Sequence, residues 1–560
     1  MILNILRIAI TIAEVILIFN LLIIVHELGH FLAARWRGLQ IDKFGIWFGK
    51  PLWKKTIKGV EFSLGSIPAG GFVLLPQMAP MEAVEGKASQ PRENLPLIKP
   101  LDKIIVAFAG PLFSFLLAVL FALIVWAVGR PASEADTTTT IGYLVPNEPA
   151  AKAGFQIGDK ILEVDGYPVS RFSGAINSVM WYIVRSERAE GETIPFKVQR
   201  GDQLLTVNSG FSRPQTDGWW ERGSLKQVGI WPAVTPIVAK VDSGSLADQA
   251  GIRANDEILE ADGQKLYHPQ QLFELAQKDP SKPLILTVNR RGKLIELKAS
   301  LGHPVVESVI KNSPAEVAGI QRGDRIVAAN NQPVSDPSVV VKEVQQHPDR
   351  VLSLTIQRGA ETKTVRLLPA TPDSPAAPDA QSKPMAGFRL ESELRSGLAF
   401  DNGGRMTIVH TSPLEQISNA VKTVTGTIGA LLAPQSDIKL QHISGPVMIM
   451  RTYYLLFESD FGWQLALWFS VVCNINLAIL NMLPIPVLDG GHILLAIIEA
   501  VRRRPINIRI LEVLQGACAL LFIGFMLYVT FYDVQDLPWN AKQRIRFNTP
   551  AKAAPPPEAR

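Results

Sequence analysis

Two histidines and a glutamate form a compact group of potential metal-site residues near the beginning of the chain. His26, Glu27 and His30 occur in the run HELGH, inside a long apolar segment. Residues four apart on a helix face the same way, about 6 Å apart, so the two imidazoles are placed to share one zinc ion. Glu27 stands beside them, placed to take a proton from water that the metal activates. Ionisable side chains are costly inside an apolar span, so the group predicts function rather than core packing.

A hydrolytic zinc site needs a third protein ligand and one open position for water. No third histidine follows HELGH at the spacing typical of soluble metzincins. A second group of polar residues occurs in NMLPIPVLDGGH at 481–492, where Asp489 and His492 are both candidate ligands. Pro484 and Pro486 interrupt the helix there and free backbone groups that protein, water or substrate would have to satisfy.

The elements that must position these groups are membrane spans. Of the 560 residues, 47% are hydrophobic and only 19% are charged, whereas soluble domains carry about 25% charge. Four segments are long enough to cross about 30 Å of hydrocarbon: 8–34, 104–128, 463–488 and 510–531. The first could instead be a signal peptide, but it lacks a small-residue cleavage site.

Basic residues predict the orientation of the spans. Lys and Arg are concentrated in the loop between spans one and two and in the short loop between spans three and four, so both loops should face the cytoplasm. The segment from about 130 to 460 and both termini then lie outside, and spans one and three run in parallel. The net charge of +5 gives no argument for a nucleic-acid partner, and the two cysteines exclude a disulfide scaffold and a four-cysteine zinc module.

The outer segment repeats one pattern three times, at 148–166, 244–263 and 312–331. Each copy has a small residue before a glycine, then a turn that closes on an aspartate, then a short apolar strand. The aspartates are Asp159, Asp256 and Asp324. A strand and a tight Arg-Gly turn follow about forty residues later in each copy. The pattern predicts a short helix, a strand, a hairpin and a returning strand three times over.

These repeats resemble PDZ domains of the kind attached to bacterial proteases. The resemblance covers most of 135–370 and implies a groove that binds an extended peptide as an added strand. Any one copy could instead be a spacer or a steric filter. A Pro/Ala/Ser-rich linker follows at 369–384, and the tail after Pro538 is expected to be disordered. The stretch 412–433 has helical apolar spacing and could lie on the membrane surface or simply connect neighbouring elements.

HELGH in the first span and N-x-x-P-x-P-x-x-D-G in the third make the chain similar to the site-2 protease family of intramembrane zinc metalloproteases. The runs FGIWFGKPLWKK (44–55), SIPAGGFV (66–73), AGPLFSF (109–115) and DIKLQHISGP (437–446) fit the pattern of that family in order. The best-known members carry two PDZ domains rather than three, which leaves open how the outer region controls entry.

The resemblance implies a role for each candidate residue. His26, His30 and Asp489 would bind Zn²⁺, with Asp489 preferred over His492, and Glu27 would be the catalytic base. SIPAGGFV would form a membrane-associated β-hairpin that pairs with an unwound substrate strand. The residues implied to contact substrate are Asn481, Pro484, Pro486, Gly70 and Gly71.

The combined prediction is a multi-pass α-helical membrane protein with four transmembrane helices and extracytoplasmic PDZ-like α+β domains. It would be a zinc metalloendopeptidase of the bacterial inner membrane that cleaves single-pass membrane proteins, such as anti-sigma factors or remnant signal peptides, after extracytoplasmic trimming. Its expected partners are those substrates, peptide or protein ligands of the PDZ-like domains, and the lipid bilayer. One alternative is a catalytically silent PDZ scaffold, which would need no ionisable residues in its spans. A transporter is the other, although it would need no large outer repeats.

The predicted domain boundaries follow these elements. They are 1–130 (first two spans with HELGH and the cytoplasmic-side hairpin region), 135–232, 233–302 and 303–370 (the three PDZ-like domains), 371–386 (linker), 387–460 (membrane-proximal segment), 461–535 (last two spans) and 536–560 (tail).

Overall fold

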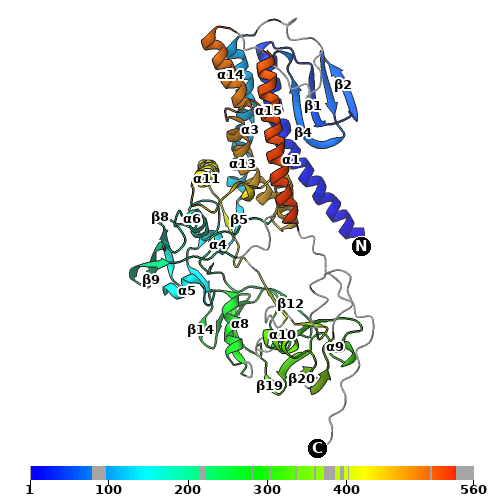
Figure 1. Cartoon of the computed structure of the whole chain (residues 1–560), viewed down its shortest axis with the longest axis vertical. Helices are drawn as coiled ribbons and strands as arrows, with labels where there is room; N and C mark the ends of the chain where they lie inside the picture. Colours follow the sequence, from blue (N-terminus) through cyan, green and yellow to red (C-terminus); the bar gives the residue numbers. More distant parts are fainter. Residues whose placement is uncertain are drawn as a thin grey trace, which may run out of the picture.

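A computed structural model describes most of the chain. The described residues are 2–78, 96, 98–214, 221–279, 282–301, 304–334, 337–358, 361–370, 385–390, 397–401, 403–504 and 508–537. Most of the predicted linker at 369–384 and the predicted disordered tail after Pro538 lie outside these residues. Long helices form a bundle at one end of the molecule, and small sheets follow one another towards the other end (Figure 1).

Among the described residues, four helices are long and apolar enough to cross a membrane, as predicted. They lie within α1 (Ile2–Arg37), α3 (Pro100–Val128), α13 (Gly462–Asn481) and α15 (Ile508–Gln535). The third is shorter than predicted, because it ends at Asn481 and a separate helix, α14 (Asp489–Arg502), follows. Pro484 and Pro486 lie in the break, where the missing proline N–H prevents a continuous helix.

Contacts at the helix ends fix the directions of the spans. Arg37 at the end of α1 pairs with Asp102 at the start of α3, with Nη2 and Oδ1 2.5 Å apart. Arg130, just after α3, lies over the ring of Trp468 near the start of α13, 4.7 Å from its centroid. Because α3 runs opposite to both helices, α1 and α13 are parallel (Figure 1).

A four-stranded sheet lies beside α1 (Figure 1). Its strands are β1 (Lys43–Phe48), β2 (Trp53–Ile57), β3 (Val60–Leu64) and β4 (Ile67–Leu74), in the order β2-β3-β1-β4. The expectation of a hairpin within SIPAGGFV is wrong, since the run belongs to one strand, β4, that pairs antiparallel with β1. Gly70, with φ of 78°, lets β4 bend without reversing. β4 is an edge strand, so one side of its backbone has no strand partner in the described part of the chain.

The three repeats form three sheets with one strand order: β10-β9-β7-β8, β16-β15-β13-β14 and β21-β20-β18-β19. The first has α5 (Pro149–Ala153), β7 (Lys160–Val164), β8 (Tyr167–Pro168), α6 (Val179–Arg185), β9 (Ile194–Arg200) and β10 (Gln203–Ser209). The second has α7 (Leu246–Gln249), β13 (Glu257–Ala261), β14 (Gln264–Lys265), α8 (Pro269–Lys278), β15 (Leu284–Arg290) and β16 (Lys293–Ala299). The third has α9 (Pro314–Val317), β18 (Arg325–Ala329), β19 (Gln332–Pro333), α10 (Pro337–Gln346), β20 (Leu352–Arg358) and β21 (Glu361–Leu367). The predicted helix, strand and hairpin are thus present in each copy.

One ion pair recurs in all three repeats. The arginine of the Arg-Gly turn makes two hydrogen bonds, both of 2.7 Å, to the aspartate that closes the earlier turn. The pairs are Arg200–Asp159, Arg290–Asp256 and Arg358–Asp324. Each guanidinium also donates to the carbonyl of a glycine that follows the preceding short helix. The bidentate contact therefore joins the helix-end turn to the returning strand.

A short strand pair completes each repeat. In the first repeat β6 (Ile141–Leu144) pairs with β11 (Ile230–Pro232). In the second, β12 (Val238–Val241) pairs with β23 (Leu398–Phe400), and in the third β17 (Val306–Val309) pairs with β22 (Phe388–Leu390). The third repeat is therefore inserted within the second. The boundaries 233–302 and 303–370 leave out β22 and β23, because strands of three residues carry no pattern of their own.

The remaining elements connect the repeats to the bundle. β5 (Arg130–Ala132) pairs with β24 (Thr407–Val409), and α4 (Glu134–Thr137) follows β5. The predicted helix at 412–433 is α11 (Pro413–Leu432), and α12 (Pro446–Glu458) precedes α13. Ala420 and Val424 of α11 are buried, and Gln416 donates to the carbonyl of Ala122 on α3 (3.1 Å). α11 thus packs against the bundle near the C-terminal end of α3.

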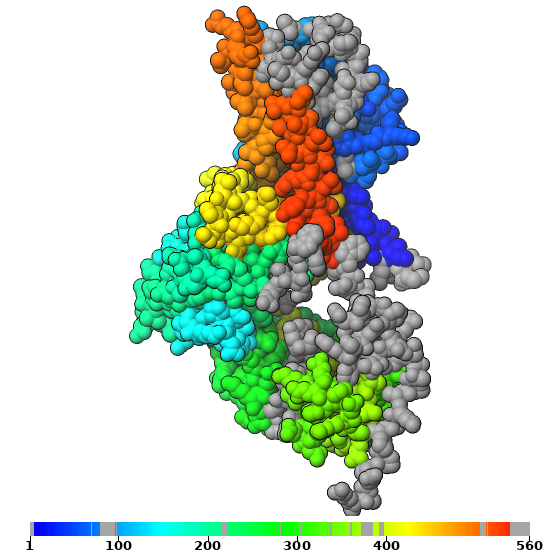
Figure 2. Space-filling view, in the orientation of Figure 1, coloured from blue at the N-terminus to red at the C-terminus, as the bar shows by residue number. Residues whose placement is uncertain are grey.

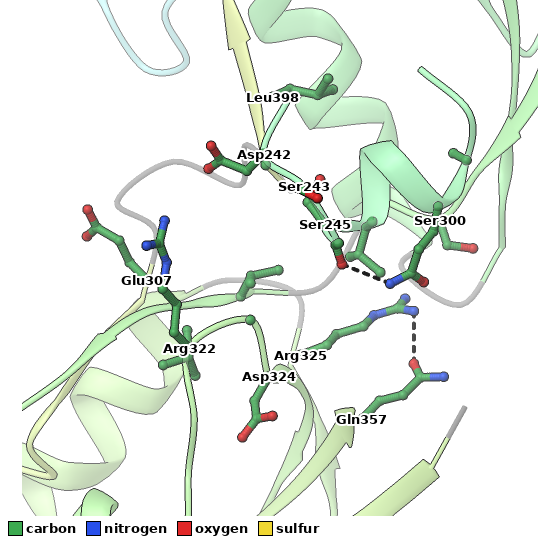
Figure 3. Close-up of a pocket in the computed structure, with 18 of the residues that line it drawn as sticks. Asp242, Ser243, Ser245, Ser300, Glu307, Arg322, Asp324, Arg325, Gln357 and Leu398 are labelled. Atoms are coloured by element: carbon green, nitrogen blue, oxygen red, sulfur yellow. Dashed lines mark hydrogen bonds between the residues drawn. The ribbon is translucent and has the colours of Figure 1, made fainter. Parts of the chain in front are cut away.

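The first repeat lies against α11, whereas the third repeat lies furthest from the bundle (Figure 2). A cleft of about 1210 Å³ lies between the second and third repeats, and its lining includes Asp242, Ser245 and Glu307 (Figure 3). Arg325 donates to Gln357 in this cleft (3.1 Å). Each repeat has its own apolar core, so the two meet across a polar gap rather than through shared packing.

Candidate active site

α1 and α14 bring three potential metal ligands together. His26 and His30 lie one turn apart on α1, and Asp489 is the first residue of α14. Asp489 Oδ2 is 3.2 Å from His26 Nε2, and Asp489 Oδ1 is 3.3 Å from His30 Nε2. The two Nε2 atoms are 3.3 Å apart. The donor atoms therefore converge on one point between the helices.

The break between α13 and α14 places Asp489 at this point. The backbone turns twice within 482–488. The N–H of Ile485 donates to the carbonyl of Leu483 (2.7 Å), and the N–H of Leu488 donates to the carbonyl of Ile485 (2.8 Å). Gly490 and Gly491 follow, and a Cβ on either would overlap a backbone carbonyl of the same loop. The glycines therefore let the loop fold tightly against the start of α14. His492, the rival ligand, lies outside the group of converging donors.

α3 holds the far side of both imidazoles. His26 Nδ1 is 3.0 Å from Ser114 Oγ, and His30 Nδ1 is 2.8 Å from the carbonyl oxygen of Val106. These contacts use the Nδ1 atoms and leave both Nε2 atoms facing Asp489. A ring nitrogen fixed in this way sets the tautomer and the orientation of the other nitrogen. Neither partner was predicted from the sequence, although Ser114 is a polar residue inside the second span.

Two glycines allow this close approach of α1 and α3. Gly110 of α3 faces the imidazoles, and a Cβ there would overlap His30 and lie 2.9 Å from His26 Nε2. Gly29 of α1 faces α3, and a Cβ there would overlap the carbonyl of Ala109. A larger residue at either position would push the helix that carries the histidines away from Ser114 and Val106.

Glu27 lies on a different face of α1, against the edge strand β4. A Cβ built on Gly71 would lie 3.2 Å from Glu27 Cγ and 3.3 Å from Ile23 Cγ2. The neighbouring Gly70 lies under the ring of Phe48, where a Cβ has no room. The predicted base and the two predicted substrate-contact glycines are thus side by side. The free backbone edge of β4 belongs to this same strand.

The other predicted substrate-contact residues lie on the loop after α13. Asn481 Nδ2 is 3.4 Å from His26 Nε2, which places this amide next to the converging donors. Pro484 is exposed and Pro486 is half-buried. The structure therefore brings Asn481 to the centre of the site, with both prolines on the adjoining turn.

The donor set fits a zinc ion. Ligand atoms about 2.0–2.1 Å from a tetrahedral zinc ion are separated by about 3.3 Å, close to the three separations between these side chains. Two imidazole nitrogens and one carboxylate leave a fourth position open, which is the arrangement of catalytic rather than structural zinc.

Comparison with known proteins agrees with this geometry. The model of Peptidase family M50 matches residues 14–525. The regulator of sigma-E protease RseP of Salmonella typhimurium (strain 14028s / SGSC 2262) is 26% identical, and the alignment covers 94% of this chain and 98% of that protein. RseP of Escherichia coli (strain K12) is 27% identical, with 94% and 98% covered. The putative zinc metalloprotease NMA0084 of Neisseria meningitidis is 27% identical, with 92% and 97% covered.

The family match spans the first candidate ligand, His26, and the last, Asp489, together with all four candidate spans in whole or in part. Its relatives include named zinc metalloproteases, and the structure supplies a donor set that suits zinc within a bundle of apolar helices. The chain belongs to peptidase family M50, the site-2 proteases, and is an intramembrane zinc metalloprotease.

Proposed function

We propose that the protein hydrolyses peptide bonds of single-pass membrane proteins within the plane of the bilayer. The observation that carries this proposal is the convergence of His26, His30 and Asp489 inside the helix bundle, with Glu27 on the same helix as both histidines. A silent scaffold would have no need for such a group in its spans, where ionisable side chains are costly.

The chain's own residues then have distinct roles. His26, His30 and Asp489 hold the zinc ion, and Ser114 and Val106 hold the two imidazole rings in place. The bound ion supplies Lewis-acid activation of water and of the scissile carbonyl. Glu27 accepts the proton of the attacking water and returns it to the leaving amine.

The substrate must leave its helical form before it is cut, because helical carbonyls are already hydrogen-bonded and shielded. The free edge of β4 offers backbone partners for an extended segment next to Glu27, and no water is present in the hydrocarbon to replace them. Asn481, Pro484 and Pro486 contact the same segment, because their loop adjoins the donors.

We assign the protein to the bacterial inner membrane, with the repeats and both termini outside. Arg35, Arg37 and Arg502 lie at the end of the bundle that the basic loops predict to be cytoplasmic. The three repeats act as PDZ-like domains, supported by their common strand order. The relatives from Salmonella typhimurium and Escherichia coli are named regulator of sigma-E protease, so anti-sigma factors trimmed outside the membrane, or remnant signal peptides, are the proposed substrates.

Co-expression with tagged single-pass membrane proteins tests the proposal. The wild type should cut a trimmed substrate, whereas Glu27→Gln should bind zinc and insert normally but cut nothing, because an amide cannot accept the proton. Metal analysis of the purified variant separates loss of the base from loss of zinc. Normal cleavage by a well-expressed Glu27→Gln protein would contradict the proposed mechanism.

A further inference from the structure

One face of α1 packs along the four-stranded sheet of β1 to β4. Asn20, Ile23 and Glu27 occupy positions i, i+3 and i+7, which lie in line on a helix and span about 10 Å. Ile23 and Glu27 both meet Gly71 of β4. Asn20 is 7% exposed and continues the same contact line further from the cytoplasmic end of α1.

Asn20 is bonded to the sheet. Its Oδ1 accepts a hydrogen bond from Trp47 Nε1 of β1 at 2.5 Å, and its Nδ2 donates to the carbonyl of Ile16 at 2.7 Å. Both polar ends of this amide are therefore satisfied within an apolar span, where an unpaired amide would be costly.

Trp47 has an unusual backbone. Its φ is 67°, in the left-handed region that bulky residues rarely adopt, and the register of β1 against β4 shifts between Ile46 and Phe48. Such a conformation is costly for a bulky side chain and persists only where its surroundings hold it. The bulge turns the Trp47 side chain to α1, where its indole N–H reaches Asn20.

The bulge also positions β4. Phe48, next along β1, stacks on Phe72 of β4 with ring centroids 5.8 Å apart and planes within 5°. The Phe48 ring fills the space over Gly70. Trp47 is thus fixed to α1, while Phe48 packs on Phe72 of β4. Phe72 is next to Gly71, the glycine that meets Glu27.

At its cytoplasmic end the sheet is joined to α1 by the chain itself, through residues 38–42. We propose that the Asn20–Trp47 hydrogen bond holds the other end of the sheet, and so sets the position of the β4 edge relative to Glu27. Asn20 and Trp47 are positioning residues for the substrate strand. This inference rests on the proposed function, in which that edge receives the substrate.

The test compares kinetic constants of the full-length protein with a trimmed single-pass substrate in detergent. Asn20→Leu removes the acceptor at similar size, and Trp47→Phe removes the donor while keeping an aromatic ring. Each should raise KM about three- to tenfold, the scale of one partly buried hydrogen bond, with a smaller fall in kcat because the displaced edge also aligns the substrate less well with Glu27. The double variant should be no worse than either single variant, because both remove the same interaction.

Trp53→Phe is the matched control, since Trp53 lies on β2 and is 53% exposed. It should leave KM unchanged. Trp47→Gly separates strain from the hydrogen bond, because glycine adopts the same φ without cost. It should raise KM as Asn20→Leu does, whereas a KM equal to that of the wild type would show that the hydrogen bond is irrelevant.

Zinc content is measured on every variant. Full zinc with raised KM and non-additive effects supports the positioning role. Additive effects, unchanged kinetics, or zinc loss in step with activity would overturn it, the last by showing a purely structural effect. A different outcome would contradict the proposed function rather than this inference. In that outcome the wild type cuts no membrane substrate, although the wild type and Asn20→Leu hold equal amounts of zinc.

Discussion

Polar side chains around the site are bonded to partners on neighbouring helices. Ser114 on α3 bonds to His26 of α1, and Asn481 at the end of α13 approaches the same imidazole. His30 bonds to the backbone of α3. Since hydrocarbon offers no alternative partner, each of these bonds also fixes the geometry of the helix pair that it joins.

Zinc affinity should follow the position of each residue around the site. Asp489→Ala removes a ligand and should lose most bound zinc, whereas Ser114→Ala leaves all ligands but frees one imidazole, lowering affinity about 10- to 100-fold. His492→Ala should retain zinc, since His492 lies outside the converging donors. Competition with a graded series of chelators measures the order. If His492→Ala lost more zinc than Asp489→Ala, the third ligand would be His492 rather than Asp489.

At this scale the sequence could predict the residues that carry chemistry but not those that hold them. The spacing in HELGH predicts that the two imidazoles lie close together, because both histidines are on one helix. Asp489 required a family resemblance, since nothing local distinguishes it from His492. Ser114 and Asn20 are visible as polar residues in apolar spans, yet their partners His26 and Trp47 are fixed by helix packing and by a β-bulge. Such contacts between distant segments have no signal in either segment alone.

At the scale of the elements, an Arg–Asp pair joins two segments in each of the three repeats. Asp159 is 1% exposed, and in the first repeat it joins Arg200 of β9 to the turn after α5. The same carboxylate accepts the N–H of Gln156 within that turn (2.9 Å). Loss of its charge would leave Arg200 with a neutral partner and weaken the link between the two segments.

Asp159→Asn should therefore destabilise the first repeat by about 2 kcal/mol, the scale of a charged hydrogen-bond pair with one buried partner. Native-state hydrogen exchange of amides in β7 and β9 should show about 30-fold lower protection. Glu163→Gln is the control, because Glu163 pairs with Lys197 at 3.2 Å but both side chains are well exposed. Such exposed pairs contribute about 0–1 kcal/mol. An equal loss of protection in Asp159→Asn and Glu163→Gln would mean that burial of the ion pair does not matter.

Elements with a strong local pattern were predictable, and those made by distant pairing were not. The apolar runs identify all four spans, and the three repeats show their own helices, strands and Arg-Gly turns. The run SIPAGGFV was expected to form a β-hairpin, but it lies in the single strand β4, which pairs with β1. β22 and β23 have three residues each, and their partners lie about 80 and 160 residues earlier. Only the folded chain shows that one repeat is inserted in another.

At the scale of the whole molecule, charged contacts tie the first repeat to the helix bundle and to the loop before α12. Arg222 pairs with Asp533 near the end of α15 at 3.0 Å, and Asp533, fully buried, also accepts N–H bonds from the start of α12. Arg213 makes two bonds of 3.1 Å to Asp437. Lys226, also buried, donates to the carbonyl of Gln435 at 3.0 Å. These contacts hold the end of α15 and the start of α12 in place, and they involve neither the second nor the third repeat.

The insertion of the third repeat gives a way to test what the outer region does. A flexible linker can replace residues 302–396. If its length equals that of the segment between β10 and β11, the change removes the third repeat but keeps β23 for pairing with β12. The ties between the first repeat and the bundle also remain. This variant should bind zinc, cut a trimmed substrate at the wild-type rate and cut an untrimmed substrate faster, because less of the outer region obstructs a bulky domain.

Deletion at the sequence-derived boundaries, 303–370, is the matched comparison, because it leaves β22 without β17. It should expose apolar strand surface and lower the yield of folded protein, measured by detergent-stable monomer and protease resistance. Cleavage assays on both deletions then separate two roles of the third repeat. If removing 302–396 leaves a folded, zinc-loaded protein that cuts neither substrate, the third repeat delivers substrate to the membrane site rather than excluding it. Faster cleavage confined to untrimmed substrates identifies steric exclusion, because the zinc ligands lie in the helix bundle and the removed residues contain none of them.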